Sequence, residues 1–433
     1  MIFNLLEQVN EFIWSHLAFF LVVGIGGYFS FSSRFFQVRR FGAIFSSFCA
    51  FFRDKQKTKQ GVHPLKAFFA AIGGCIGLGN VVAICTAIQI GGPGALLWVW
   101  VGALAGMLIQ YSEVYLGMKY RVKNEKGSYD GGPMYFLPVA YKVRWVAPLV
   151  SLLLCFYGVE IFMFNIMVDS LSVNWGIDPY LLTAVLLIAT IVVALGGINR
   201  VGEVCSGLIP LFIVLYLFMG FWILISHFRD LPAIFQMIFQ GAFTKQAAIG
   251  AFAGSGVALA ISMGLSRGAY SGDIGVGYTS VIHAESSTTQ FQRQAALTIV
   301  GILIDTIIST MSVLLILITG YWHSGIDVAL MVQEALGLFF PYMHYFMPFF
   351  LFLLGYTTIL AYFVVGVKCA KFIAPTWGPR IYYLYACIAL PTFAFVNSIH
   401  AFLLMSLSGA CLLLLNLIGI FLLRKEVKFG LDE

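Results

Sequence analysis

Charged residues are scarce in this chain of 433 residues. Asp, Glu, Lys and Arg make up only 10% of it, whereas apolar residues make up 60%; soluble domains have about 25% and about 45–50% of these classes. A soluble fold of this composition would expose apolar patches far larger than the roughly few hundred Å² that monomers tolerate. The low charge excludes a soluble globular protein and indicates that lipid surrounds most of the chain.

Patterns that bind metals or carry hydrolytic chemistry are also missing. The eight cysteines form no C-x-x-C pair, and the seven histidines have no metal-ligand spacing. No H-E-x-x-H motif is present, and the nearest substitutes for a nucleophile and its partner, Ser271 and Asp273, have no obvious base beside them. We therefore expect no resident cofactor and no enzymatic activity, and we interpret the cysteines as small core residues.

Long apolar runs are what the sequence has in quantity. Runs of about 20 mainly apolar residues can cross the hydrocarbon layer as helices. Eleven are expected, near 13–32, 67–90, 95–118, 145–170, 179–197, 206–227, 247–282, 296–320, 347–373, 382–399 and 401–423. The predicted fold class is an all-α polytopic membrane protein, with one transmembrane domain over residues 1–433 and a first span that is retained rather than cleaved.

The net charge of +6 reflects topology rather than a nucleic-acid partner. Nearly all Lys and Arg residues fall on one side of the predicted membrane, above all in the connections 33–66 and 119–144. Only Arg229, Lys245 and Arg267 do not fit. Because basic loops stay cytoplasmic, this pattern predicts an external N-terminus and a cytoplasmic C-terminus.

Two of the predicted spans carry glycine runs at their centres, which weaken a helix. The second contains Gly73, Gly74, Gly77 and Gly79, and the seventh contains Gly264, Gly268, Gly272, Gly275 and Gly277. Close helix packing also selects glycine. In the second span, however, Asn80 favours a true break, because a buried amide needs a partner.

The spacing of the two interrupted spans suggests an internal repeat. They are five spans apart, so residues 67–227 and 247–423 would form two five-helix halves of opposite orientation, preceded by the extra helix 13–32. In such a repeat the half-helix N-termini suit a substrate carboxylate, and the freed carbonyl groups suit a monovalent cation. The sequence therefore predicts a transport site where the two breaks meet.

The stretch GLGNVVAICTAIQIGGPG from Gly77 to Gly94 resembles the signature region of the alanine or glycine:cation symporter family. Further ordered matches follow over about residues 62–372, including Gly131 to Tyr135, Gly196 to Ile198, Arg267 to Ser271, and Asp305. The family is similar to transporters of LeuT type, which implies a five-plus-five inverted repeat with one added helix. The resemblance implies sodium-coupled symport of alanine or glycine across a bacterial inner membrane.

Site residues follow from the resemblance. It implies that the amide groups around Leu78 and Gly79, together with Asn80, bind the substrate carboxylate. It also implies a sodium site made by the carbonyl groups of Gly73 and Ile76 and the hydroxyl groups of Thr357 and Thr358. The full predicted substrate site comprises Cys75, Gly77, Leu78, Gly79, Asn80, Met163, Ser271, Gly272, Asp273 and Tyr362.

The chain departs from the family pattern in this site. The seventh-span motif reads SGDIGVGY from Ser271 to Tyr278, where the family usually has SNEAGLGS. Met163 stands where a glutamine is common, and Tyr362 where a tryptophan is usual. A larger or more apolar amino acid is then one expectation, and an unchanged preference for alanine or glycine is the other.

Acidic residues at membrane depth are functional candidates. Glu113 and Asp169 near span ends suit capping or snorkelling, and Asp305 suits a buried polar contact. We interpret Asp273 as the partner of Arg267 or as a gate carboxylate, and Glu160 as a group able to couple protons. The main hypothesis is sodium-coupled symport of a small neutral amino acid; proton coupling and a non-transporting sensor or channel are the alternatives.

Overall fold

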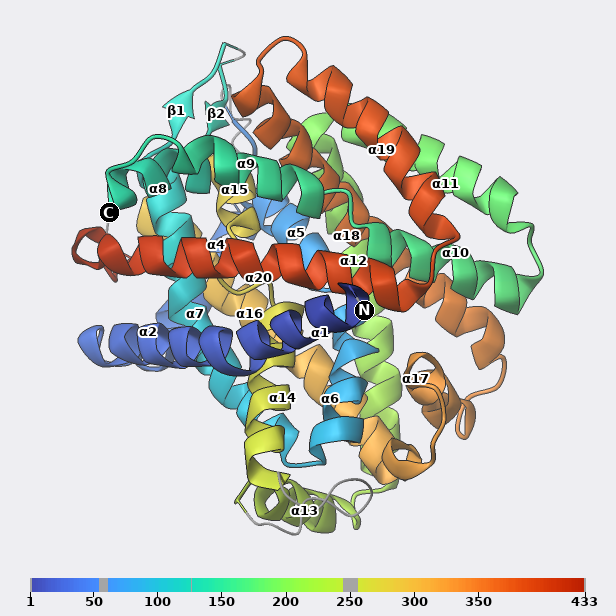
Figure 1. Cartoon of the computed structure of the whole chain (residues 1–433). Helices are drawn as coiled ribbons and strands as arrows, with labels where there is room; N and C mark the ends of the chain where they lie inside the picture. The colour runs from blue at the N-terminus through green and yellow to red at the C-terminus, as the bar shows by residue number, and fades with distance from the viewer. Residues whose placement is uncertain (1, 54–60, 126, 244–255, 432–433) are drawn as a thin grey trace.

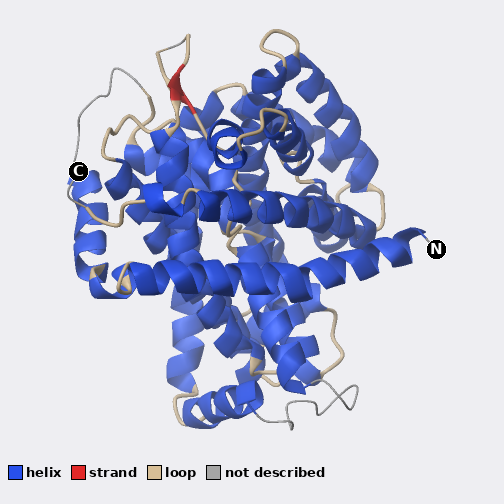
Figure 2. Cartoon of the chain, turned by 60° about the vertical axis from the view of Figure 1, so that its left-hand side comes forward, coloured by secondary structure: helices blue, strands red, loops and turns tan. Residues whose placement is uncertain are grey.

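The computed structural model describes residues 2–53, 61–125, 127–243 and 256–431. Lys245, part of the basic connection 33–66 and the start of the predicted span 247–282 lie outside the described residues. Within these ranges the chain is nearly all helical, and the only strands form the hairpin β1 (Val122–Lys123) and β2 (Tyr129–Asp130) (Figure 2). The all-α prediction is confirmed.

The N-terminal run is one long helical rod. It consists of α1 (Ile2–Phe12), the π-helical segment η1 (Ile13–Ala18) and α2 (Phe19–Ser32). In Figure 1 this rod and α20 (Ser398–Leu422) cross the front of the bundle side by side. Two short helices follow it, α3 (Phe36–Arg39) and α4 (Phe41–Arg53).

The first half of the bundle contains the first interrupted helix. Its elements are α5 (Pro64–Cys75), η2 (Leu78–Asn80), α6 (Ala83–Gly91), α7 (Ala95–Lys119), α8 (Pro133–Tyr141), α9 (Val146–Tyr157), α10 (Ile161–Trp175), α11 (Pro179–Ala194), α12 (Gly197–Ser226) and α13 (Leu231–Phe243). Helices α5 and α6 are bent by 54° across their break.

The second half contains the second interrupted helix. Its elements are α14 (Gly256–Ser271), α15 (Tyr278–Ala284), α16 (Phe291–Ile318), η4 (Tyr321–His323), α17 (Val328–Gly337), α18 (Met343–Ile373), α19 (Gly378–Ala394), α20 and η5 (Arg424–Glu426). Helix α7 packs against both α14 and α16, and α5 packs against α12 and α18. The two interrupted helices therefore lie inside the bundle.

Every predicted span has a helical counterpart in the described residues. By length and apolar composition alone, seven helices there can cross a membrane, or eight with the bent pair α5–α6. The other three predicted spans correspond to α11 with 16 residues, α19 with 17 residues and the interrupted pair α14–α15.

The outer helices present apolar stripes at helical spacing. On α11, Leu181, Val185, Ile188 and Val192 recur every three or four residues and are all exposed. Helix α12 shows the same pattern with residues such as Val214. Since water would penalise such stripes, lipid is the solvent that these surfaces fit.

Candidate functional site

The first helix break is made of extended backbone. Helix α5 ends at Cys75, and Ile76 (φ −86°, ψ 98°) and Gly77 (φ −138°, ψ −158°) are extended before η2 begins. An extended stretch cannot continue the helical hydrogen bonds, so carbonyl groups near the end of α5 lose their partners. Freed backbone groups persist at membrane depth only where protein or a polar cavity satisfies them.

Asn80 closes this break from within. Its Oδ1 accepts a hydrogen bond from the Gly77 N–H at 3.1 Å, and its Nδ2 donates to the carboxyl group of Asp305 and to the Ser309 hydroxyl at 3.0 Å. The side chain is fully buried. Asn80 thus joins the break to α16, and its amide NH2 group is engaged by Asp305 and Ser309 rather than lining the cavity described below.

Thr358 on α18 meets the same break. Its hydroxyl group lies 3.0 Å from the carbonyl oxygens of both Gly73 and Leu354, to which it can donate. Thr357 donates only to carbonyl groups of its own helix, at Leu353 and Leu354. The structure therefore brings Thr358 and Gly73 together, whereas Thr357 makes the backbone contact that is common for threonine in membrane helices.

Glu113 on α7 holds the second break. Its carboxylate oxygens accept hydrogen bonds from the backbone N–H groups of Gly277 at 3.1 Å and Ser280 at 3.0 Å. Asn416 on α20 donates to the same carboxylate at 2.9 Å and to the Gly275 carbonyl at 3.0 Å. Glu113 is completely buried, so it caps the start of α15 and does not snorkel.

Two other polar residues have structural contacts. Asp305 is bonded to Asn80, and the Ser271 hydroxyl lies 3.4 Å from its carboxyl group. His283 on α15 is buried and pairs with Gln294 at 2.7 Å. Asp305 therefore makes the buried polar contact expected of it, and His283 has a structural partner.

A buried cavity lies where the two breaks meet. It has a volume of about 20 Å³, roughly enough for one water-sized group. The residues around it are Gly74, Cys75, Gly77, Gly79, Tyr157, Glu160, Met163, Ser271, Asp273, Thr358 and Tyr362. A whole amino acid requires more space than this, so binding one requires side chains around the cavity to move.

Most of the predicted site residues line this cavity. Leu78, Asn80 and Gly272 do not: Gly272 instead borders a second small cavity on the α16 side, beside Asp305. Among the predicted sodium ligands, Thr358 lines the cavity itself, Gly73 contacts Thr358, and Ile76 is fully buried beside them.

Three residues that border the cavity belong to neither the predicted substrate site nor the predicted sodium site. Gly74 differs in no visible way from its glycine neighbours in the sequence. Tyr157 is one aromatic residue among many in an apolar run, and only the fold places its hydroxyl 3.2 Å from Asp273. Glu160 had a detectable signal, since it is a charged residue inside an apolar span, but the prediction gave it a proton-coupling role only.

The departures from the family pattern are neighbours in space. The rings of Tyr278 and Tyr362 stack with centres 4.0 Å apart, and Tyr157 meets Tyr362 edge-on at 5.2 Å. The Tyr278 hydroxyl donates to the carbonyl groups of Ala70 and Ala71 on α5. An aromatic cluster therefore forms one wall of the site.

The interpretation of Asp273 as the ion-pair partner of Arg267 is wrong. Neither side chain belongs to an ion pair with the other in the described residues. The Arg267 guanidinium group lies 5.1 Å from the Phe402 ring and borders a different cavity, near Glu11. Asp273 turns toward Tyr157 instead because Asp273 adopts a left-handed conformation (φ 48°) within the break.

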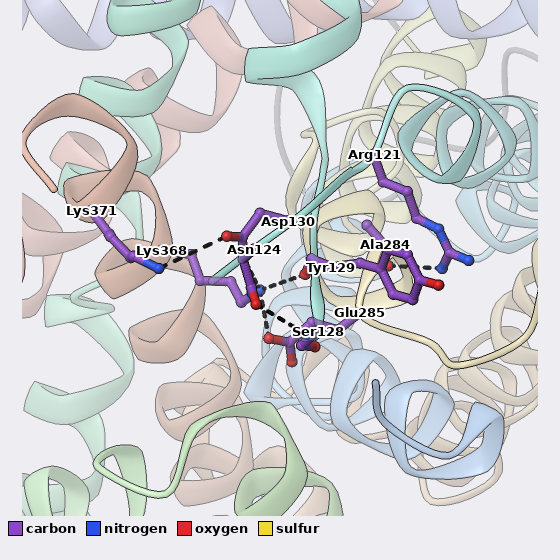
Figure 3. Close-up of polar contacts among 9 residues, drawn as sticks. All are labelled: Arg121, Asn124, Ser128, Tyr129, Asp130, Ala284, Glu285, Lys368 and Lys371. Atoms are coloured by element: carbon purple, nitrogen blue, oxygen red, sulfur yellow. Dashed lines mark hydrogen bonds and ion pairs between the residues drawn. The ribbon is translucent and has the colours of Figure 1, made fainter. Parts of the chain in front are cut away.

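Figure 3 shows a polar cluster where α18 approaches the hairpin. Lys368 Nζ lies 2.9 Å from Oδ1 of Asp130 and 2.6 Å from Oε1 of Glu285, and its side chain is 14% exposed. Burial alone would raise the pKa of the Asp130 carboxyl, but the Lys368 ammonium holds it below its ordinary value. Asp130 is therefore ionised at neutral pH, and Lys368 joins the hairpin to the chain after α15.

Backbone contacts reinforce this cluster. Arg121 donates to the carbonyl groups of Ala284 and Ser286, and its guanidinium group lies 3.8 Å from the centre of the Tyr129 ring (Figure 3). Val62, just before α5, exchanges backbone hydrogen bonds with the chain just after α15. The two interrupted helices are thus connected at this end.

A polytopic helical bundle in which two interrupted helices meet at a buried cavity is the architecture of a membrane transporter of LeuT type. Sequence comparison makes the assignment specific: the chain belongs to the sodium:alanine symporter family, whose model matches residues 1–433. The family and the fold are those of transporters, not of enzymes.

Relatives align along nearly the whole chain. The uncharacterized transporter YflA of Bacillus subtilis is 32% identical over 98% of this chain and 91% of its own. The sodium/alanine symporter AgcS of Methanococcus maripaludis is 29% identical, with coverage of 98% and 95%. The probable sodium/glutamine symporter GlnT of Bacillus subtilis is 26% identical, with coverage of 98% and 89%.

Solved structures share the fold at low sequence identity. MhsT in complex with L-phenylalanine matches with a TM-score of 0.53 and 16% identity, covering 81% of this chain and 87% of that chain. A mutant of the manganese transporter of Eremococcus coleocola matches with a TM-score of 0.51 and 12% identity, covering 83% and 76%. The predicted LeuT-like fold is confirmed.

Proposed function

We propose that this protein is a sodium-coupled symporter that carries a small neutral amino acid by alternating access. The observation that carries the proposal is the contact between the Thr358 hydroxyl and the Gly73 carbonyl at 3.0 Å, at the broken end of α5. A hydroxyl and freed carbonyl groups are oxygen ligands of the kind that a sodium ion takes at a broken membrane helix. Sodium is the coupling ion, and Ile76 and Thr357 complete the proposed ligand set, Thr357 as the weaker ligand because its hydroxyl group is bonded within α18.

The substrate site lies beside the proposed sodium ligands, in the cavity. Backbone N–H groups around Leu78 and Gly79 receive the carboxylate, as half-helix N-termini do. Met163 and Tyr362 face the substrate side chain, and their apolar surfaces favour a neutral amino acid. Relatives named as sodium/alanine and sodium/glutamine symporters support this substrate class.

The proposed topology places the N-terminus outside and the C-terminus in the cytoplasm of a bacterial inner membrane. The cluster around Lys368 and Arg121 then lies on the cytoplasmic face, in agreement with the distribution of basic residues. Within this topology, residues 67–227 and 247–423 are the two inverted five-helix halves.

The test is uptake into proteoliposomes. Labelled alanine, glycine and larger neutral amino acids are offered with an inward sodium gradient, and again after an ionophore has dissipated the gradient; protein-free liposomes are the control. We expect saturable uptake that collapses with the sodium gradient.

The other outcomes separate the alternatives. Uptake driven only by a pH gradient would replace sodium with protons, and uptake that never saturates would indicate a channel. Binding without flux would indicate a sensor. No uptake of any amino acid by folded protein would contradict the proposal.

A further inference from the structure

Glu160 occupies an unusual position for a carboxylate. It lies between the end of α9 and the start of α10, inside an apolar span, and only 3% of its surface is exposed. Its Oε2 is inaccessible to solvent and has no hydrogen-bond partner among the described residues. Since a buried charge without a partner is very unfavourable, this oxygen calls for a positively charged ligand.

Asp273 approaches the same cavity from the second helix break. Both residues adopt left-handed backbone conformations, with φ of 49° at Glu160 and 48° at Asp273. Such conformations are strained in non-glycine residues and persist only where the surrounding structure enforces them. The fold therefore holds two carboxyl groups against one small cavity.

No basic side chain balances this pair. The described residues that line the cavity include no Lys, Arg or His. The titratable groups that face Glu160 there are Cys75 from α5, Tyr157 from α9, Tyr362 from α18 and Asp273 itself; Asp305 lies on the α16 side, bonded to Asn80. The Tyr157 hydroxyl donates a hydrogen bond to Asp273 at 3.2 Å.

The charges in the site with amino acid and one sodium ion bound do not balance. Two carboxylates contribute two negative charges, a neutral amino acid contributes none overall, and one sodium ion at Gly73 and Thr358 contributes one positive charge. One further positive charge neutralises the pair. Glu113 needs no such cation because N–H groups of Gly277, Ser280 and Asn416 bond to its carboxylate, whereas Oε2 of Glu160 has no donor of this kind among the described residues. The cavity volume of about 20 Å³ suits a single small ion.

We infer that Glu160 and Asp273, with the Tyr157 hydroxyl, form a second monovalent-cation site, separate from the sodium site at Gly73 and Thr358. This inference rests on the proposed symport function. Each cycle then carries two cations with one neutral amino acid. The cation is sodium or a proton, since either supplies the one positive charge.

The experiment measures the ratio of charge to substrate. Proteoliposomes loaded with labelled amino acid are held at a series of membrane potentials against a fixed sodium gradient, and the potential at which net flux vanishes gives the number of charges per substrate. We expect about two positive charges per amino acid for the wild type and about one for Glu160→Gln. Asp169→Asn, which changes an exposed acid on α10, is the matched control and keeps the wild-type ratio.

A wild-type ratio of about one, or an unchanged ratio in a transporting Glu160→Gln variant, overturns the second site. If that variant does not fold, the wild-type ratio still decides. A repeat of the measurement with a pH gradient in place of part of the sodium gradient identifies the second cation. Absence of sodium-driven uptake in the wild type is a different result, because it contradicts the symport function itself.

Discussion

The two helix breaks differ in which residues bond to their freed backbone groups. In the first, between α5 and η2, the bonding residue belongs to the break itself: Asn80 accepts a hydrogen bond from the Gly77 N–H and joins the segment to α16. In the second, between α14 and α15, the bonding residues are distant in the sequence: Glu113 accepts from the break, and Asn416 donates to Glu113. The first break is a local motif, and the second is a product of the tertiary fold.

This difference assigns different tasks to the breaks. The first leaves carbonyl groups near Gly73 within reach of Thr358, so its backbone contacts the proposed sodium ion. The second turns the side chain of Asp273 toward the cavity, and its backbone is fixed by a carboxylate on α7. Substitutions that remove the support of the second break should therefore lower stability, whereas substitutions beside Gly73 and Thr358 in the first should weaken sodium binding.

The largest effect is expected from Glu113→Ala. The change leaves the N–H groups of Gly277 and Ser280 and the amide of Asn416 without their acceptor, and each buried unpaired group costs about 1–3 kcal/mol. We expect the free energy of unfolding to fall by at least about 3 kcal/mol, measured as a large drop in melting temperature in detergent. Glu125→Ala, at an exposed position of the hairpin, is the control.

The melting temperature also tests whether the second break depends on residues distant in the sequence. A melting temperature of Glu113→Ala equal to that of Glu125→Ala would mean that the second break does not depend on the distant carboxylate.

Gly77→Ala should have the next largest effect, on transport rather than folding. Residue 77 has an extended backbone that alanine also adopts, but a Cβ atom would lie 2.8 Å from the Thr358 hydroxyl oxygen. Crowding of this kind costs about 1–3 kcal/mol, or roughly 5- to 150-fold. We expect the half-saturating sodium concentration for uptake to rise by such a factor.

The control for Gly77→Ala is Gly24→Ala on α2, where an added Cβ meets nothing within 4 Å. If both variants bind sodium like the wild type, the space beside Thr358 has no part in ion coupling.

The smallest effect is expected from removing one of two adjacent hydroxyl groups, those of Thr357 and Thr358. Thr358→Val removes the contact with the Gly73 carbonyl and should raise the half-saturating sodium concentration about 3- to 10-fold, which is the size of one hydrogen bond. Thr357→Val removes only contacts within α18 and should change it less. Equal effects of the two variants would argue against a specific role of Thr358.

The features that were predictable from the sequence are those with a local signature. Apolar runs of sufficient length marked the helices, and glycine runs marked both breaks, because each signal lies within about 20 residues of chain. The meeting of Gly77, Met163, Asp273 and Tyr362 at one cavity followed from the family resemblance.

Partners distant in sequence were not predictable. Glu113 and Asn416 are 303 residues apart in the sequence, and only packing of α7 and α20 against the second break brings them together. Asn80 was correctly singled out as a buried amide, but its partners on α16 could not be inferred from a single sequence. The ion pair expected of Arg267 failed because closeness along the chain says nothing about the direction of two side chains across a break.

The backbone contact at Val62 provides a built-in reporter of motion. The Val62 N–H donates to the Glu285 carbonyl at 2.9 Å, and the Ser287 N–H donates to the Val62 carbonyl at 2.8 Å. These amide hydrogens exchange with deuterium from the solvent only when the chain before α5 parts from the chain after α15. At a pH where exchange is faster than reclosing, their exchange rates equal the opening rate at this end of the protein without any substitution, and a comparison with the turnover rate gives the number of openings per molecule carried.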